Sequence, residues 1–384
     1  MFKQLILYFL LICAVAFAQS NVNPDISLIG TFDTFTNFNM DTPEYGKINF
    51  ELPSFELFID GYLNPYARAT ANIAFEEGEF AAEEVYANIV RGLPLDIQVK
   101  AGKYLLGFGK LNLAHPHAWP FLERPLFHQI YFSGEGFNDV GVNLSFILPT
   151  ENFYSTIDLG VYKGDAITTN TAGEDADPNE VRGNSLIFVG RIGSFFSIGD
   201  FSNLECGLSS SYGNYAKSPF YVPDSIGFSS QMLTYLYGGI DFKFKYKPDS
   251  YTSLVIQAES ILNHRDVIRG INIEPITETI NTYGAFIYFD YQFLKQFSVG
   301  AKYDFTYGII GNDPLFNTLA NDDMNKTQGI AYWVGYYPIE ETLALRLGAQ
   351  HLIFELADNL KKDSETTITL QLLFSLGPHK AHQF

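Results

Sequence analysis

The feature that most constrains this chain is a two-residue alternation of apolar and polar side chains, repeated in segment after segment. Residues 297–307 read FSVGAKYDFTY, with apolar or aromatic side chains at odd positions and small or polar ones at every even position. Residues 366–376 repeat the pattern, with Ile368, Leu370 and Leu372 facing opposite to Thr369 and Gln371. Successive side chains of a strand point to opposite faces. The chain is therefore predicted to consist of strands that are apolar on one face only.

The same alternation predicts about 16 strands, with boundaries good to about two to four residues. After residue 19 no apolar run approaches the roughly 20 residues that a membrane-spanning helix requires. The predicted strands lie near residues 26–38, 48–60, 65–76, 82–91, 96–104, 139–149, 153–162, 185–195, 203–213, 232–247, 250–262, 279–292, 296–307, 328–338, 341–355 and 366–376.

The predicted connections fall into two groups that alternate along the chain. The tight ones lie near residues 64–65, 92–94, 149–152, 247–250 and 338–341. The long, polar ones are 105–138, 163–184, 214–231, 264–278 and 308–327. This rhythm is typical of a transmembrane antiparallel β-barrel with short periplasmic turns and long extracellular loops. A soluble sandwich or jelly roll is the competing all-β fold, but it lacks such a rhythm and usually ends within about 250 residues.

The first residues indicate export. Lys3 precedes an apolar run from Leu5 to Phe17, and Ala16-Phe17-Ala18 has the small-x-small pattern of a cleavage site. We expect residues 1–18 to be a removed signal peptide and residues 19–384 to form a single barrel in the outer membrane of a Gram-negative bacterium. The run is too short for a membrane anchor.

The charge balance excludes one class of partner. With 24 Lys and Arg against 43 Asp and Glu, the formal charge of −19 argues against nucleic-acid binding. Acidic residues gather at 76–79, at Glu83-Glu84 and at 173–177, which we expect to lie in outer loops. They predict a solvated surface, or one that binds lipopolysaccharide through divalent ions.

Residues 98–109, QVKAGKYLLGFG, resemble the G-x-F/Y-K-x-x-F-G signature of the phosphate-selective porin O and P family. The resemblance implies a 16-stranded porin that assembles as a homotrimer. Two departures are Gly107, where the family usually has Pro, and the lack of an arginine run, so phosphate selectivity does not carry over. Residues 115–121, HPHAWPF, resemble a stretch of outer-membrane proteins described as zinc-regulated receptors.

The connection 105–138 is the most unusual of the long loops. Its length and its three prolines indicate a functional element, which we expect to fold inward and narrow the channel. Alternatively, Phe121, Leu126, Phe127 and Phe132 pack the barrel mouth as a cap. The candidate pore-lining residues are Lys110, His115, His117, Glu123, Arg124 and His128 in this connection, and Arg68, Lys100, Lys302 and Arg346 on predicted strands.

Three further interpretations concern side-chain chemistry. His115 and His117 are weak candidates for metal ligands, and Pro116 between them favours a structural turn, so no metal or cofactor is assigned. Lumen charges could pair along a strand, as in Asp241 with Lys243 and Lys302 with Asp304. Tyrosines are expected to form aromatic girdles at the membrane interfaces, namely Tyr235, Tyr237, Tyr288, Tyr291, Tyr332, Tyr336 and Tyr337.

Together these features predict a porin through which small hydrophilic or ionic solutes diffuse passively, with anions and phosphate among the solutes considered. Its partners are expected to be outer-membrane lipids, lipopolysaccharide and small solutes. The alternatives are a barrel linked to metal (zinc) uptake, an outer-membrane enzyme, or a purely structural barrel. No G-x-S-x-G motif is present, which argues against the enzyme.

Overall fold

The computed structural model describes residues 24–39, 45–76, 79–132, 136–148, 150, 153–168, 186–215, 219–221, 228–230, 233–269, 276–308, 325–339, 342–355 and 362–377. The signal-peptide prediction, the acidic segment 173–177 and the side chains of Glu76 and Glu79 lie outside this part of the chain. Among the described residues, no helix is long and apolar enough to span a membrane.

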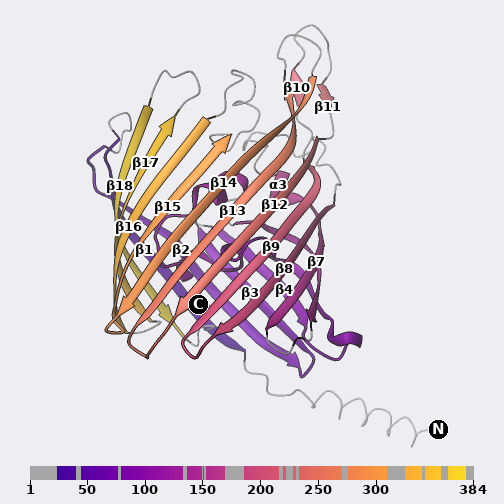
Figure 1. Cartoon of the computed structure of the whole chain (residues 1–384), viewed down its shortest axis with the longest axis horizontal. Helices are drawn as coiled ribbons and strands as arrows, with labels where there is room; N and C mark the ends of the chain where they lie inside the picture. The colour runs from indigo at the N-terminus through magenta and orange to yellow at the C-terminus, as the bar shows by residue number, and fades with distance from the viewer. Residues whose placement is uncertain are drawn as a thin grey trace, which may run out of the picture.

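Sixteen antiparallel strands form a closed barrel, in which β1 pairs with β18 to complete the wall (Figure 1). The first nine are β1 (Asp25–Asn37), β2 (Asn49–Asn64), β3 (Ala67–Glu76), β4 (Glu79–Ile89), β5 (Gln98–Leu105), β6 (Asn138–Leu148), β7 (Tyr154–Tyr162), β8 (Ile187–Ile198) and β9 (Ser202–Tyr215). The remaining seven are β12 (Leu233–Tyr246), β13 (Ser253–Arg269), β14 (Ile276–Phe293), β15 (Phe297–Gly308), β16 (Asn325–Ile339), β17 (Leu343–Glu355) and β18 (Lys362–Leu376). The predicted fold is confirmed.

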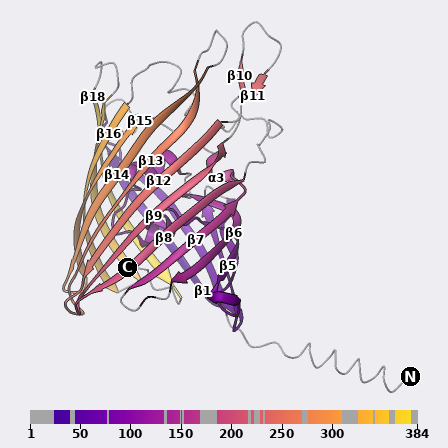
Figure 2. The same ribbon diagram turned by 45° about the vertical axis from the view of Figure 1, so that its right-hand side comes forward.

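Short elements occupy the connections. They are the helical turns η1 (Pro94–Asp96), η2 (Leu111–Leu113), η3 (Pro116–Ala118), α2 (Leu126–Tyr131) and α3 (Asp165–Thr168), and the strands β10 (Pro219–Tyr221) and β11 (Phe228–Ser230). The last two pair as a separate small sheet between β9 and β12, which the sequence did not indicate. In Figure 2 this small sheet stands beyond the rim of the barrel.

The barrel wall exposes its apolar side chains and buries its polar and charged ones, which is the reverse of a soluble protein. Along β15, Phe297, Val299 and Tyr303 are exposed, whereas Lys302 and Asp304 are buried. In β18, Leu370 is 48% exposed and Gln371 only 6% exposed, as the alternation predicted. An apolar exterior and a polar interior are what a barrel in hydrocarbon requires, and closure leaves no strand edge unpaired.

One predicted long loop is wrong. The sequence predicts a loop over residues 264–278, but β13 continues to Arg269 and β14 begins at Ile276, and these two residues pair. Asp266 accepts hydrogen bonds from the hydroxyls of Thr234 and Thr279 on the neighbouring strands. Polar side chains at the strand end satisfy one another here, so the hairpin extends beyond its apolar part.

Candidate functional site in the barrel lumen

The connection between β5 and β6 lies inside the barrel, where carboxylates of the wall hold its backbone. Glu259 of β13 accepts hydrogen bonds through Oε1 from the backbone N–H groups of Lys110 (3.1 Å) and Leu111 (2.6 Å). Asp304 of β15 accepts one from the N–H of Leu126 at 3.3 Å. Both carboxylates are buried on the inner face. We call residues 106–132 and 136–137 the inner segment.

Cations of the wall hold the carbonyl groups of the inner segment. Nζ of Lys302 donates to the backbone oxygen of Glu123 at 2.7 Å, and Arg346 of β17 donates to that of Trp119. Lys302 also forms the expected ion pair with Asp304, at 3.0 Å. Two of the predicted pore-lining residues, Lys302 and Arg346, are thus bound to the inner segment.

Aromatic side chains fill the space between the inner segment and the wall. Phe121 lies 5.1 Å from the ring of Tyr288 and 5.9 Å from that of Trp333, and Phe127 stacks 5.7 Å from Phe286. The full buried cluster includes Tyr104, Phe108, Trp119, Phe121, Phe127, Phe132, Phe137, Tyr235, Tyr237, Phe286, Tyr288 and Trp333. The alternative prediction, that Phe121 and Phe127 serve for packing, is therefore confirmed in part. Both rings pack against aromatic residues of the inner face.

This cluster corrects the girdle assignment for three tyrosines. Tyr235, Tyr237 and Tyr288 are 2%, 4% and 5% exposed and face inward. By contrast, Tyr332 and Tyr336 are exposed on the outside. The alternating pattern identifies two faces, but an aromatic residue is compatible with either lipid or a packed interior, so its type could not assign the face.

Two of the predicted charged residues of the inner segment are engaged with neighbours. Nζ of Lys110 lies 2.6 Å from the Glu205 carboxylate of β9. The Arg124 guanidinium lies 5.2 Å above the Trp119 ring. Burial raises the pKa of the Glu123 carboxyl, although Lys302 opposes the effect.

His128 is enclosed by aromatic rings. Its imidazole lies 4.5 Å from the Phe127 ring and 5.0 Å from that of Phe132. Neither ring nitrogen has a hydrogen-bond partner among the described residues. Burial, reinforced by the positive charge of Arg124, lowers the pKa of His128 well below its usual value. This histidine is therefore a neutral core residue.

The wall residues Arg68 and Lys100 also have neighbours inside the barrel. Arg68 forms an ion pair with Asp60, and Nζ of Lys100 lies 3.9 Å from the ring centre of Tyr86 and 4.2 Å from that of Tyr104. Cations over aromatic faces are stabilised by the ring quadrupole.

Asp241, for which a pairing with Lys243 is expected, forms an ion pair with Arg191. Arg191 lies on β8 and Asp241 on β12, with β9 between them. The planar guanidinium reaches across the intervening strand and donates through both terminal nitrogens. Such a bidentate geometry is favoured over a single lysine contact.

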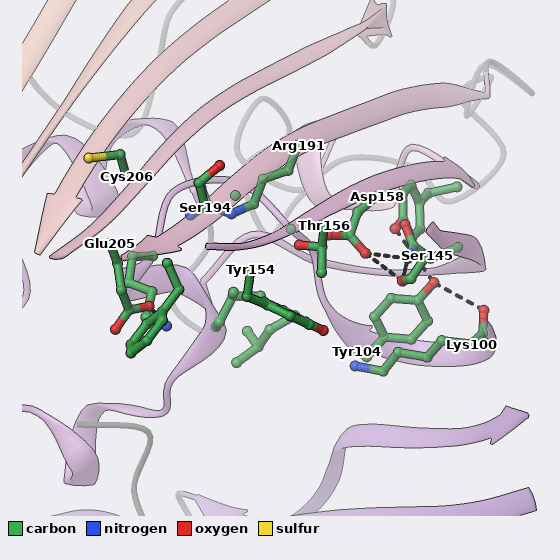
Figure 3. A pocket seen from close by; sticks show the side chains of 18 residues that line it. Lys100, Tyr104, Ser145, Tyr154, Thr156, Asp158, Arg191, Ser194, Glu205 and Cys206 are labelled. Carbon is green, nitrogen blue, oxygen red and sulfur yellow. Dashed lines mark hydrogen bonds and ion pairs between the residues drawn. The ribbon is translucent and has the colours of Figure 1, made fainter. Parts of the chain in front are cut away.

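A cavity of about 390 Å³ remains between the inner segment and strands β5 to β9 (Figure 3). Its lining includes Lys100, Lys110, Asp158, Arg191 and Glu205. Tyr104 and Tyr154 contribute aromatic surface, and Ser145 donates to Asp158. Charges of both signs therefore face one cavity, where a hydrated solute would meet them.

A second polar cluster joins the inner segment to β2 and β4. His115 directly precedes η3 and His117 lies within it, and their rings stack 5.7 Å apart, within 5° of parallel. Nδ1 of His117 lies 3.1 Å from Oε1 of Glu56, and Nδ1 of His115 lies 3.4 Å from Oε2 of Glu83. Burial lowers the pKa of His115, but the carboxylates of Glu84, Glu56 and Glu83 outweigh this and raise it to about 9.

The position of Glu83 and Glu84 corrects their assignment to an outer loop. Both are buried on the inner face of β4. The pairing of β3 with β4 passes from Asn72↔Glu84 to Ile73↔Ala82, which leaves Glu83 as the extra residue of a β-bulge. A bulge interrupts the alternation of faces. Two consecutive carboxylates can therefore point inward, which strict alternation does not predict.

The chain was compared with known proteins at the level of families, sequences and structures. No family model matches the chain. An uncharacterized protein of Aquifex aeolicus is 28% identical over 402 aligned residues, covering 96% of this chain and 81% of that protein.

Among solved structures, the outer membrane channel DcaP of Acinetobacter baumannii aligns with a TM-score of 0.57 at 10% identity, covering 94% of this chain and 99% of DcaP. The anion-selective porin of Comamonas acidovorans aligns with a TM-score of 0.57 at 12% identity, covering 93% of this chain and all of the porin. The chain has the fold of outer-membrane porins. At these identities the porin fold is what the alignments establish.

Proposed function

We propose that this protein is an outer-membrane porin through which small hydrophilic or ionic solutes diffuse passively. The closed barrel with an apolar exterior supports placement in the outer membrane. A wall of 16 strands supports a pore, because barrels of that size enclose a lumen wide enough for water. The similarity to DcaP and to the Comamonas porin supports the same proposal.

The observation that carries the proposal is the inner segment with its anchors. Its backbone is bound by wall residues on β13, β15 and β17, which supports a position within the lumen rather than over the mouth. The remaining cavity has charged and aromatic walls. We therefore propose that residues 105–138 form the constriction, and that the charges beside them set ion preference.

Planar-bilayer recording tests the proposal. The folded protein is expected to give discrete conductance steps, and deletion of residues 112–130 is expected to increase the size of each step. An enzyme barrel or a structural barrel would give no steps. The absence of conductance from barrels that migrate as folded species in unheated gels would refute the porin function.

A preference for anions is the finer proposal. Lys100, Lys110 and Arg191 line the cavity against two carboxylates, Asp158 and Glu205. Asp241, outside the lining, pairs with Arg191, so Lys100 and Lys110 are the cations expected to favour anions, and phosphate is one of the anions to test. Reversal potentials in a salt gradient would measure it.

We also propose a homotrimer. A trimeric form of OmpT, an outer membrane protein of Vibrio cholerae, aligns with a TM-score of 0.52 at 7% identity, covering 92% of this chain and 99% of that chain. Mass photometry of protein extracted in mild detergent would measure the assembly, and a monomer mass would contradict the proposal.

A further inference from the structure

We propose that His115, Glu56 and Glu83, with His117 packed beside them, form a binding site for a divalent transition-metal ion of the zinc class, which fastens the inner segment to the barrel wall. Glu56 comes from β2 and Glu83 from β4, while His115 directly precedes η3 and His117 lies within it. The proposal goes beyond passive diffusion, because it assigns a specific ligand to one side of the lumen.

The arrangement of potential ligand atoms carries the argument. One ligand atom each from Glu56, Glu83 and His115 lie within 4.8 Å of one another. Nδ1 of His115 is 3.4 Å from Oε2 of Glu83 and 3.8 Å from Oε2 of Glu56. Two atoms bound tetrahedrally to one zinc ion, each about 2.1 Å from it, are separated by about 3.4 Å. The spacing is thus that of neighbours around a common cation.

The same distances fit direct ion pairs less well. A charge-assisted hydrogen bond between an imidazolium and a carboxylate is usually about 2.7–2.9 Å long. The contacts of His115 with Glu83 and Glu56 are longer than this by about half an ångström or more. Only the 3.1 Å contact of His117 with Glu56 approaches the normal range.

Charge supports a cation at this position. Glu56, Glu83 and Glu84 are 3%, 9% and 7% exposed, so three carboxylates gather where water is scarce. Metal ligation requires the imidazoles in their neutral form, and a divalent ion held there would offset most of the charge of the three carboxylates. Imidazole and carboxylate together select borderline metals such as zinc over calcium or magnesium.

A neighbouring residue holds the carboxylates in place. The Asn72 amide, fully buried on β3, donates through Nδ2 to Oε2 of Glu56 and to Oε2 of Glu83, both at 2.7 Å. Outer residues that orient metal ligands typically contribute 10- to 100-fold to affinity. The β-bulge at Glu83 and this amide together bring two carboxylates to one point.

The test uses the full-length barrel folded in detergent, with His379 and His382 replaced by Ala so that the tail imidazoles cannot bind metal. Titration with Zn²⁺ by calorimetry, and with Co²⁺ by visible absorption, is expected to give one ion per chain with a tetrahedral cobalt spectrum. The variants His115→Ala/His117→Ala and Glu83→Gln are expected to lose that ion. Asn72→Ala is expected to weaken it by about 10- to 100-fold.

A matched control replaces two exposed histidines of the wall, His264→Ala/His351→Ala, and is expected to bind as the parent does. Heat-modifiable gel mobility confirms that each variant is folded. The site is refuted if the folded parent binds no ion, which would leave the histidines as ion-pair partners of the carboxylates. Equal binding by the parent and by His115→Ala/His117→Ala would refute it as well. Neither outcome depends on conductance, so the porin proposal stands or fails separately.

Discussion

The replacement Glu259→Leu tests whether the inner segment stays docked through its backbone anchors. Oε1 of Glu259 accepts hydrogen bonds from the N–H groups of Lys110 and Leu111 and from the Gln257 amide. Leucine has a similar volume but no acceptor. Two buried N–H groups of the inner segment then lose their partner, which costs about 1–3 kcal/mol each.

The two losses together destabilise the docked state by about 2–6 kcal/mol. We expect a value in the lower half of this range, because the variant is also relieved of the cost of burying a carboxylate. Since 1.4 kcal/mol is a factor of ten, the docking equilibrium shifts by roughly 30-fold or more. A segment docked almost all the time would then spend a measurable fraction of time away from the wall.

Single-channel recording is the assay. Glu259→Leu is expected to add frequent transitions to a larger conductance, whereas Glu259→Gln, which keeps an acceptor oxygen, is expected to stay close to the parent. Glu355→Leu is the control, because it removes a partly exposed ion pair with Lys326 at 3.7 Å that is worth about 0–1 kcal/mol. If folded Glu259→Leu conducts as steadily as the parent, the carboxylate is not an anchor.

Three further predictions concern the wall and the lumen. Leu370→Arg places a charge in hydrocarbon and is expected to destabilise the folded barrel by about 2–4 kcal/mol, measured by urea unfolding in lipid vesicles. Gln371→Arg, beside Asp33 on the inner face, is expected to have a much smaller effect. A larger effect of Gln371→Arg would show that the two faces of β18 are assigned the wrong way round. The pKa of His128 is lower in the docked segment than the ordinary value of about 6.5. The contribution of His128 to the stability of the docked segment is therefore present above pH 6.5 and is lost as the pH falls below that value. Acidification from pH 7 to 5 is therefore expected to increase open-state current noise, and His128→Phe is expected to reduce that increase; an unchanged pH profile would show that another group is responsible. Lys100→Gln/Lys110→Gln should shift the reversal potential toward cations, more at 0.1 M than at 1 M salt, whereas Lys163→Gln, at an exposed ion pair with Asp165, should not; equal shifts would exclude a lumen origin.

The sequence by itself determined the fold class, because alternation is a local property. In β15 and β18 each position is apolar or polar according to the face it occupies, and lipid outside with polar groups inside imposes this on nearly every strand. The sequence also predicts the short turns, because their Pro, Asn, Asp and Gly residues favour turn conformations through local backbone effects.

The unusual length of the connection 105–138 was also visible in the sequence, but its contacts were not. Glu259 and Arg346 are more than 100 residues away from the backbone groups that they bind. No periodicity encodes such a pairing, which depends on how the closed wall places inner faces opposite one another.

Tertiary structure alone decided which aromatic residues face inward and which charges meet. Tyr237 looks like an interfacial residue until Phe132 and Phe137 of the inner segment pack against it, and the buried Tyr235 lies beside Tyr237. Glu83 and Glu84 look like part of a solvated acidic loop until the β-bulge turns both toward His115. A bulge changes the face of a side chain without changing composition, so local patterns could not reveal this cluster.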